Sequence, residues 1–272
     1  MENIQKLTSN YIMRRLFESD LYYFSASTLA TLLNVSRVQV YEILRRLRRE
    51  GLVRSVEAGK YLLLGYQPER VLANPYFIAT RLCHPAYLSY WSALHFYGLT
   101  EQVPRTVFVA TTRQHRRLNF DGATFVFAHL APHKFFGYQR ESIGDLPVLV
   151  AEVEKALVDS LDQLRYAGGL SEVAKALYAA RERVDLERLV EYANRMRNRS
   201  LCSRLGYLLE QFGQPTEGLD ASPSPVLLDP SKPTPHKRRR AGTRSKAQRR
   251  YDSRWRVWIN VSTEELLAWR DS

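Results

Sequence analysis

The sequence predicts an α+β protein in which a small N-terminal unit of helices and a hairpin precedes a larger mixed α/β domain. Two patterns support this prediction. Residues 25–64 hold two short amphipathic helical segments, followed by two strand-like segments around a glycine. Residues 105–151 hold short segments rich in valine and phenylalanine, after which helical spacing takes over. Strands first and helices afterwards are typical of α+β layers.

Prolines and composition divide the chain. With 272 residues, 45% of them hydrophobic, the chain is long enough for one small and one larger core. A first boundary is expected at Gln67-Pro68 and Asn74-Pro75, because proline ends regular structure. We therefore expect a first domain over 1–67, an α+β domain over 75–213 that is completed by 251–272, and a Pro-rich and basic linker over 214–250.

Hydrophobic spacing predicts the elements of the larger domain. Strands are expected at 105–110, 123–130, 146–151 and 255–261. Helices are expected at 88–97, 152–164, 185–198, 199–212 and 262–269. Asp185 and Ser262 are suitable N-caps for two of these helices, and Gly213 is a suitable stop.

The net charge is +12 and the pI about 9.8, which favours a polyanionic partner, because each cation set against a phosphate releases condensed counterions. Eight positive charges lie within 237–250 without an acid among them, and subtracting them from +12 leaves +4 for the rest. Such a run repels itself and favours an arm that becomes ordered on a polyanion. The accessory nucleic-acid contacts expected here are Lys237, Arg238, Arg239, Arg240, Arg244, Lys246, Arg249 and Arg250.

Cysteine usage and hydropathy point to a compartment. Cys83 and Cys202 are too few for a disulfide framework or a cysteine-built zinc site, which fits a reducing environment. The first ten residues lack the apolar run of a signal peptide, and no stretch approaches the roughly 20 apolar residues of a membrane span. We expect a cytoplasmic protein without a membrane partner.

The segment 25–64 is the most informative part of the sequence. Ser25 is placed to cap one helix, Asn34 lies in a turn, and Ser36 is placed to cap a second helix that Gly51 ends. A hairpin pattern over 52–64 follows, which completes a winged helix-turn-helix. The apolar stripe of the second helix consists of Val40, Ile43, Leu44 and Leu47, so the opposite face is expected to point outward.

The expected DNA contacts divide by their position. At the start of the second helix, arginine suits guanine, glutamine suits adenine and valine suits a thymine methyl, which makes Ser36, Arg37, Val38 and Gln39 the base-reading residues. The residues expected to contact phosphates are Tyr41, Arg45, Arg46 and Arg49 on the helix and Arg54 and Lys60 on the hairpin. The alternative is a three-helix packing unit whose arginines form a solvated face.

Behind this unit come YLSYWSALHFYGLT at 87–100, PRTVFVATT at 104–112, FFGY at 135–138, EKAL at 154–157 with Asp159, RYAGG at 165–169 and YDSRW at 251–255. In this order they resemble the AbiEi-type antitoxins, transcriptional regulators of type IV (abortive-infection) toxin–antitoxin pairs. The resemblance implies repression of the protein's own operon through promoter inverted repeats in double-stranded DNA. It also implies a C-terminal domain that counteracts a nucleotidyltransferase-like toxin, with no stable complex required.

An acidic cluster invites comparison with nuclease sites. Glu152, Glu154, Lys155 and Asp159 lie close together, but the position two residues before the lysine is Val153, which cannot ligate magnesium. Acids at the start of a helix suit its macrodipole instead. The histidines have no metal-ligand spacing and the chain has no Gly-rich phosphate loop, so we expect neither catalysis nor a metal or cofactor.

Two other hypotheses stay open. The larger domain of a ligand-responsive regulator would contain a deep apolar pocket with convergent polar groups, and an enzyme would hold a metal between carboxylates.

Four arginines are expected to gather around a helix junction: Arg195, Arg197, Arg199 and Arg204. They suit DNA backbone, a toxin or RNA as a partner, or they form ordinary solvated charge.

Overall fold

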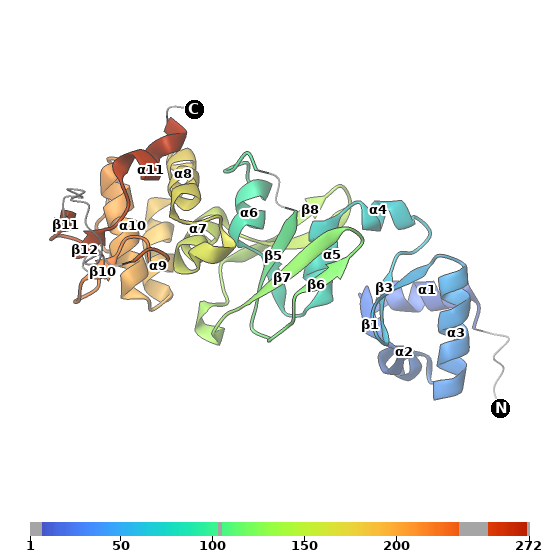
Figure 1. Ribbon diagram of the computed structural model, residues 1–272. Coiled ribbons are helices and arrows are strands. Elements are labelled where there is room, and N and C mark those ends of the chain that lie inside the picture. Colours follow the sequence, from blue (N-terminus) through green and yellow to red (C-terminus); the bar gives the residue numbers. More distant parts are fainter. Residues whose placement is uncertain (1–6, 103–104, 234–249, 271–272) are drawn as a thin grey trace, which may run out of the picture.

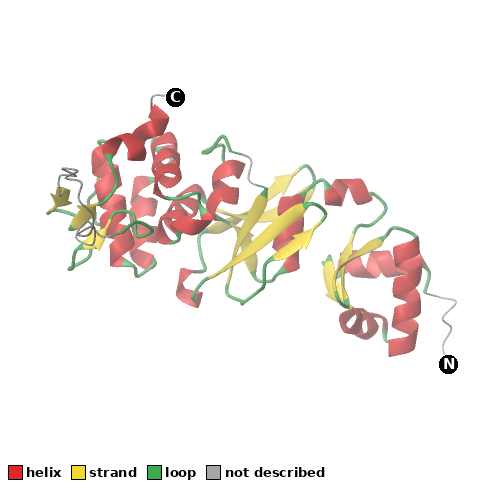
Figure 2. Ribbon diagram, viewed as in Figure 1, coloured by secondary structure: helices red, strands yellow, loops and turns green. Residues whose placement is uncertain are grey.

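The computed structural model describes residues 7–102, 105–233 and 250–270 and arranges them in three parts along one direction (Figure 1). An N-terminal unit of helices and short strands lies at one end, a mixed β-sheet lies in the middle, and a group of helices lies at the other end (Figure 2). The α+β class is confirmed.

The N-terminal unit has its own core. Its elements are α1 (Ser9–Glu18), β1 (Tyr23–Ser25), α2 (Ala26–Leu33), α3 (Arg37–Arg49), β2 (Val53–Glu57) and β3 (Lys60–Leu63). The strands form an antiparallel sheet in the order β1-β3-β2. Ile12, Leu29 and Leu47 are fully buried beneath it, and Val40, Ile43 and Leu44 belong to the same cluster. The helices and the hairpin lie where the sequence places them; their assignment as a winged helix-turn-helix remains a prediction.

Local capping fixes the turn between α2 and α3. The Ser25 hydroxyl accepts a hydrogen bond from the Thr28 amide at 3.0 Å, which starts α2. Asn34 ends that helix in the left-handed conformation with φ of 52°, which asparagine tolerates better than most residues. Ser36 then caps α3, so three residues, 34–36, set the angle between the two helices.

The segment that leaves this unit is helical. Pro68 and Pro75 are the first residues of α4 (Pro68–Leu72) and α5 (Pro75–Leu82). Each proline lies between two elements, as expected, and in addition it begins a new helix. Proline suits the first position of a helix because the amide N–H it lacks would have no partner there. Val71 and Phe77 are buried, so the connection packs against the larger domain.

The middle layer is a sheet of six strands in the order β6-β7-β5-β4-β9-β8. Its strands are β4 (Ala86–Leu88), β5 (Thr106–Thr111), β6 (Leu118–Phe120), β7 (Ala123–His129), β8 (Tyr138–Ile143) and β9 (Leu146–Ala151), and α6 (Tyr90–Phe96) follows β4. β5 pairs in parallel with β7, and β4 pairs in parallel with β9, while the other pairs are antiparallel. The strands expected from the sequence are β5, β7 and β9, which are the longer apolar ones.

The third layer contains α7 (Val153–Asp162), α8 (Leu170–Ala180), α9 (Leu186–Arg195), α10 (Arg199–Gln211) and α11 (Thr263–Leu267). A small sheet of β10 (Val226–Leu227), β12 (Val257–Ile259) and β11 (Arg250–Asp252) lies beside these helices (Figure 1). Residues 214–233 belong to this layer, because β10 pairs with β12 and Leu228 is fully buried. The prediction of one linker over 214–250 is wrong for this part, and residues 234–249 lie outside the described residues.

The C-terminal segment 250–270 packs on α10 through the indole ring of Trp255. Trp255 is 5% exposed and its Nε1 donates a hydrogen bond to the Glu210 carboxylate on α10. Its ring covers Gly206, where an added Cβ would lie only 2.2 Å from a ring carbon. Glycine at this position of α10 thus leaves the space into which the indole packs.

Replacing Gly206 tests whether Trp255 packs on α10 as described. We expect Gly206→Ala to destabilise the protein by about 1–3 kcal/mol in urea unfolding, because the methyl group collides with the indole ring. In a Trp255→Ala background the same change is expected to stabilise by up to about 1 kcal/mol, because alanine is the better helix former. A Gly206→Ala effect of equal sign in both backgrounds would contradict the packing of Trp255 on α10.

Candidate nucleic-acid interface

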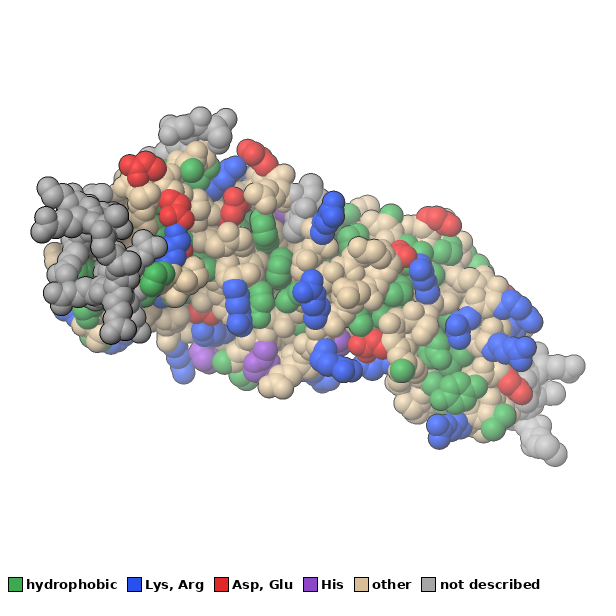
Figure 3. Space-filling view, in the orientation of Figure 1, with side chains coloured by type: hydrophobic (Ala, Val, Ile, Leu, Met, Phe, Trp, Pro, Cys, Tyr) green, Lys and Arg blue, Asp and Glu red, His purple; other side chains and the backbone are tan. Residues whose placement is uncertain are grey.

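The outward face of α3 combines cations with exposed apolar groups. Val38 is 71% exposed and Tyr41 46% exposed, on the face opposite the buried stripe. Arg37, Arg45 and Arg49 are also exposed, and none of them has an ion pair with the described residues. In Figure 3 Lys and Arg side chains lie over the N-terminal unit together with hydrophobic ones. An exposed valine among arginines is typical of a surface that meets a partner with apolar and anionic groups.

The base-reading residues are not equivalent. Ser36 and Gln39 form a reciprocal capping box: the Ser36 amide donates to Gln39 Oε1 at 2.8 Å, and the Gln39 amide donates to Ser36 Oγ at 3.3 Å. A bidentate contact to adenine needs the same oxygen, so the cap competes with it. In this conformation Arg37 and Val38 are the two whose side chains make no hydrogen bond or ion pair with the residues that the structure describes.

Arg46 has a role within the fold. It is half-buried, and its guanidinium donates to the carbonyl oxygen of Leu7, in the segment before α1. This contact ties the middle of α3 to the start of the chain. The expected phosphate contact from Arg46 is therefore replaced by an internal hydrogen bond in this structure, and sequence spacing alone did not distinguish it from Arg45.

The two hairpin cations also have protein partners. Arg54 donates to Asp121 at 2.6 Å and its guanidinium lies 5.3 Å from the centre of the Phe120 ring, so the hairpin contacts the β6–β7 turn. Lys60 pairs with Glu57 at 2.9 Å across the hairpin turn. The Lys60 bond lowers the pKa of the Glu57 carboxyl below its usual value. Neither cation is free for phosphate in this conformation.

Of the eight basic residues expected to contact nucleic acid within 237–250, the structure describes only the last. Arg250 is the first residue of β11. The remaining residues of this group lie outside the described residues: Lys237, Arg238, Arg239, Arg240, Arg244, Lys246 and Arg249.

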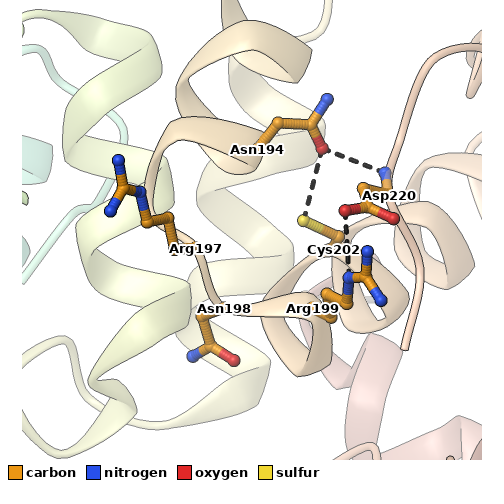
Figure 4. Close-up of a pocket in the computed structure, with 6 residues that line it drawn as sticks. All are labelled: Asn194, Arg197, Asn198, Arg199, Cys202 and Asp220. Carbon is orange, nitrogen blue, oxygen red and sulfur yellow. Dashed lines mark hydrogen bonds and ion pairs between the residues drawn. The ribbon is translucent and has the colours of Figure 1, made fainter. Parts of the chain in front are cut away.

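Three of the four arginines around the α9–α10 junction have contacts within the protein, and Figure 4 shows one of them, Arg199, beside Asp220. Arg199 pairs with Asp220 at 3.0 Å, Arg204 is buried and donates to the Leu227 carbonyl at 2.9 Å, and Arg195 lies over the Phe136 ring at 4.0 Å. Arg197 points away from the hydrogen bonds that join Asn194, Cys202, Asp220 and Arg199. Arg204 is therefore not available to a polyanion and Arg199 is neutralised by Asp220, whereas Arg195 and Arg197 stay exposed.

The same pocket, of about 280 Å³, holds one of the two cysteines. Burial raises the pKa of the Cys202 thiol to about 11, and its Sγ donates to Asn194 Oδ1 at 3.6 Å. The thiol therefore stays protonated at neutral pH, and a protonated thiol is a poor nucleophile.

A buried ionic cluster occupies the junction between the sheet and α7. Lys155 and Asp159 are both 0% exposed and form an ion pair one helical turn apart. The carboxylate also accepts hydrogen bonds from the Tyr87 hydroxyl at 3.1 Å and from Ser89 Oγ at 2.7 Å. Burial raises the pKa of Asp159 and lowers that of Lys155, against the attraction between the two charges.

Aromatic rings enclose the ammonium group. The Phe136 ring centre lies 4.8 Å from Lys155 Nζ, and the Tyr87 ring centre lies 5.6 Å from it. Tyr138 stacks on Tyr87 with centroids 4.9 Å apart. A Cβ on Gly137 would come within 3.2 Å of the Lys155 side chain, so glycine permits this close approach. Three of the segments that carry the antitoxin resemblance, 87–100, 135–138 and 154–159, thus meet in one cluster.

The acids at the start of α7 support the fold. Glu154 Oε1 accepts a hydrogen bond from the Asp185 amide at 2.9 Å, and Glu152 Oε2 accepts one from the Tyr192 hydroxyl at 2.6 Å. Over residues 7–102, 105–233 and 250–270, no group of three or more His, Cys, Asp or Glu side chains is arranged to hold a metal ion. In the same ranges no helix has the length and hydropathy of a membrane span.

Comparison with known proteins identifies a structure with a similar fold but no family to which the chain belongs. No family model and no curated protein matches the chain. The crystal structure of RV2827C protein from Mycobacterium tuberculosis is similar, with a TM-score of 0.58 and 15% sequence identity over 97% of this chain and 94% of that chain. At this identity the likeness concerns the fold alone.

The buried ion pair predicts that substitutions of Lys155 and Asp159 have strongly non-additive effects on the free energy of unfolding. We expect Lys155→Met to destabilise the protein by about 3–5 kcal/mol, because Asp159 is left buried without a counter-charge. Adding Asp159→Asn, which keeps an oxygen for Tyr87 and Ser89, is expected to recover part of this loss. Urea unfolding of the single and double variants measures the coupling.

A second ion pair with the same spacing serves as the control. Arg14 and Glu18 on α1 pair at 2.9 Å, but their side chains are 75% and 50% exposed. Their substitutions are expected to change stability by about 0.5 kcal/mol at most. Additive effects of the Lys155 and Asp159 substitutions would show that the pair is not coupled.

Proposed function

We propose that this chain is a DNA-binding transcriptional regulator that reads duplex DNA with α3 of a winged helix-turn-helix. The observation that carries the proposal is the exposed face of α3, where Val38 is 71% exposed beside Arg37, Tyr41 and Arg45. The first turn of such a helix suits base edges in the major groove, and later arginines suit phosphates. A solvated face of a packing unit would not require an exposed valine and tyrosine at adjacent helical positions.

We further propose that the protein is an autorepressor and antitoxin that works in the cytoplasm and acts by binding rather than catalysis. This part rests on the resemblance to AbiEi-type antitoxins. The operator would be inverted repeats at its own promoter, and the larger domain would counteract a nucleotidyltransferase-like toxin, with or without a stable complex. The meeting of three resemblance segments around Lys155 gives this domain a defined core, which supports a shared architecture.

The contacts on α3 predict two kinds of variant. Arg37→Ala is expected to weaken binding to the protein's own promoter DNA by about tenfold or more and to relax sequence preference, because a base contact is lost. Arg45→Ala is expected to weaken promoter and random DNA alike and to lower the slope of log K against log salt by about 0.9. Fluorescence anisotropy at several salt concentrations measures both.

Two arginines elsewhere serve as matched controls. Arg54→Ala is expected to have a smaller effect than Arg45→Ala, because Asp121 already neutralises Arg54. Arg140→Ala, on the exposed strand β8, is expected to leave DNA affinity unchanged. The proposal fails if the wild-type protein gives no footprint on its promoter at moderate salt, or if all four variants bind alike.

The antitoxin function is tested by growth. If the neighbouring gene encodes a nucleotidyltransferase-like toxin, as the proposal requires, co-expression of the full chain with it, from a promoter that the protein does not regulate, is expected to restore colony formation. The Arg37→Ala and Arg45→Ala double variant is expected to restore growth equally well, because the larger domain supplies the antidote. Failure of the wild-type chain to rescue would exclude the antitoxin role while leaving the DNA-binding test intact.

A further inference from the structure

A groove of about 1040 Å³ lies on the larger domain next to the N-terminal unit. Its lining comes from five places in the chain: the α4–α5 connection, the end of α6, the start of β5, the β6–β7 hairpin and the β8–β9 turn. This volume is that of sites for drug-sized molecules, and such sites are lined by apolar groups with a few polar ones.

The groove is mainly apolar and aromatic. Its buried lining includes Ile78, Val107 and Phe125, which are at most 2% exposed. Tyr76 and Phe96 are half-buried and also line it. The aromatic rings favour a flat, unsaturated body in the groove over a purely polar ligand.

One cation in the lining has no acidic partner. Arg105 precedes β5, is exposed and makes no ion pair with the described residues. The other charged residue of the lining, Asp121, is neutralised by Arg54 at 2.6 Å. The groove therefore presents an apolar surface with one uncompensated positive charge.

A second donor comes from a tyrosine–histidine pair. Tyr76 Oη and His95 Nδ1 are 2.8 Å apart. Burial raises the pKa of Tyr76 to about 12, so its hydroxyl keeps its proton, and either group can be the donor of this hydrogen bond. If the hydroxyl donates to Nδ1, the Nε2–H of the ring is left as a donor; if Nδ1–H donates to the hydroxyl oxygen, the O–H of the tyrosine is left as a donor. Both polar features of the groove thus favour a ligand with acceptor oxygens.

We propose that this groove is a binding site for a small aromatic carboxylate, whose ring packs against Tyr76 and Phe96 and whose carboxylate meets Arg105. The site does not depend on DNA binding. It lies where a ligand would also touch Phe120 and Asp121, the two residues that hold Arg54 of the β2–β3 hairpin. The groove has the apolar lining and convergent polar groups that distinguish a ligand-responsive regulator from a simple repressor.

The test uses 1-naphthaleneacetate and its neutral amide with the full chain in isothermal titration calorimetry. We expect saturable binding of the acid, and about tenfold or more weaker binding of the amide, because a hydrogen-bonded charge is lost. Arg105→Gln is expected to weaken binding of the acid to the level of the amide, without changing binding of the amide.

Two further variants separate the site from general attraction of anions to a basic protein. Arg140→Gln removes an exposed arginine that does not line the groove, and it is expected to leave binding unchanged. Ala123→Trp is expected to fill the groove and abolish binding of both compounds, with unfolding curves to confirm that the variant folds. The proposal is overturned if the acid does not bind saturably, if acid and amide bind equally, or if Arg140→Gln weakens binding as much as Arg105→Gln.

Discussion

The ion pair of Lys155 and Asp159 is the constraint on which the larger domain depends. Both charges are fully out of water, which is tolerated only when each finds compensating partners. Tyr87 and Ser89, at the end of β4, supply hydrogen bonds to the carboxylate. The partners come from the sheet, the loop before β8 and α7, so forming the pair fixes the relative positions of the two layers. A helix held in this way gives α8, α9 and α10 a rigid surface to pack on.

Contacts made by arginines form a second set of constraints, which fixes the position of the N-terminal unit on the larger domain. Arg81 on α5 pairs with Asp20 at 2.7 Å, and its guanidinium lies 5.0 Å from the Tyr22 ring centre. Leu62 and Leu64 of the hairpin side join the core of the larger domain. With Arg54 bound to Asp121, the unit that we propose to contact DNA is held in a defined orientation beside the groove. Many positive charges in this basic chain thus serve the fold, which is why net charge overestimates the surface available to a polyanion.

Fold and function rest on different evidence here. A likeness at 15% identity to a mycobacterial structure describes how the layers are arranged, and one architecture supports many functions. What distinguishes this chain is the chemistry of particular sites. The exposed face of α3 and the cationic apolar groove are separate features for which we propose separate partners, and a regulator that contains both would couple them through the hairpin contact.

The sequence by itself determined the local elements. Caps such as Ser36 and Asp185 act on neighbouring amides, and the apolar stripe of α3 follows from helical spacing, so both can be read without a fold. Tertiary structure decided which equivalent side chains stay free: Arg45 and Arg46 are neighbours, but only Arg46 meets the Leu7 carbonyl. It also decided that the three-residue strand β4 pairs with β5 and β9, and that residues 214–233 pack against the C-terminal helices. Those outcomes depend on partners distant in the chain, which local pattern does not encode.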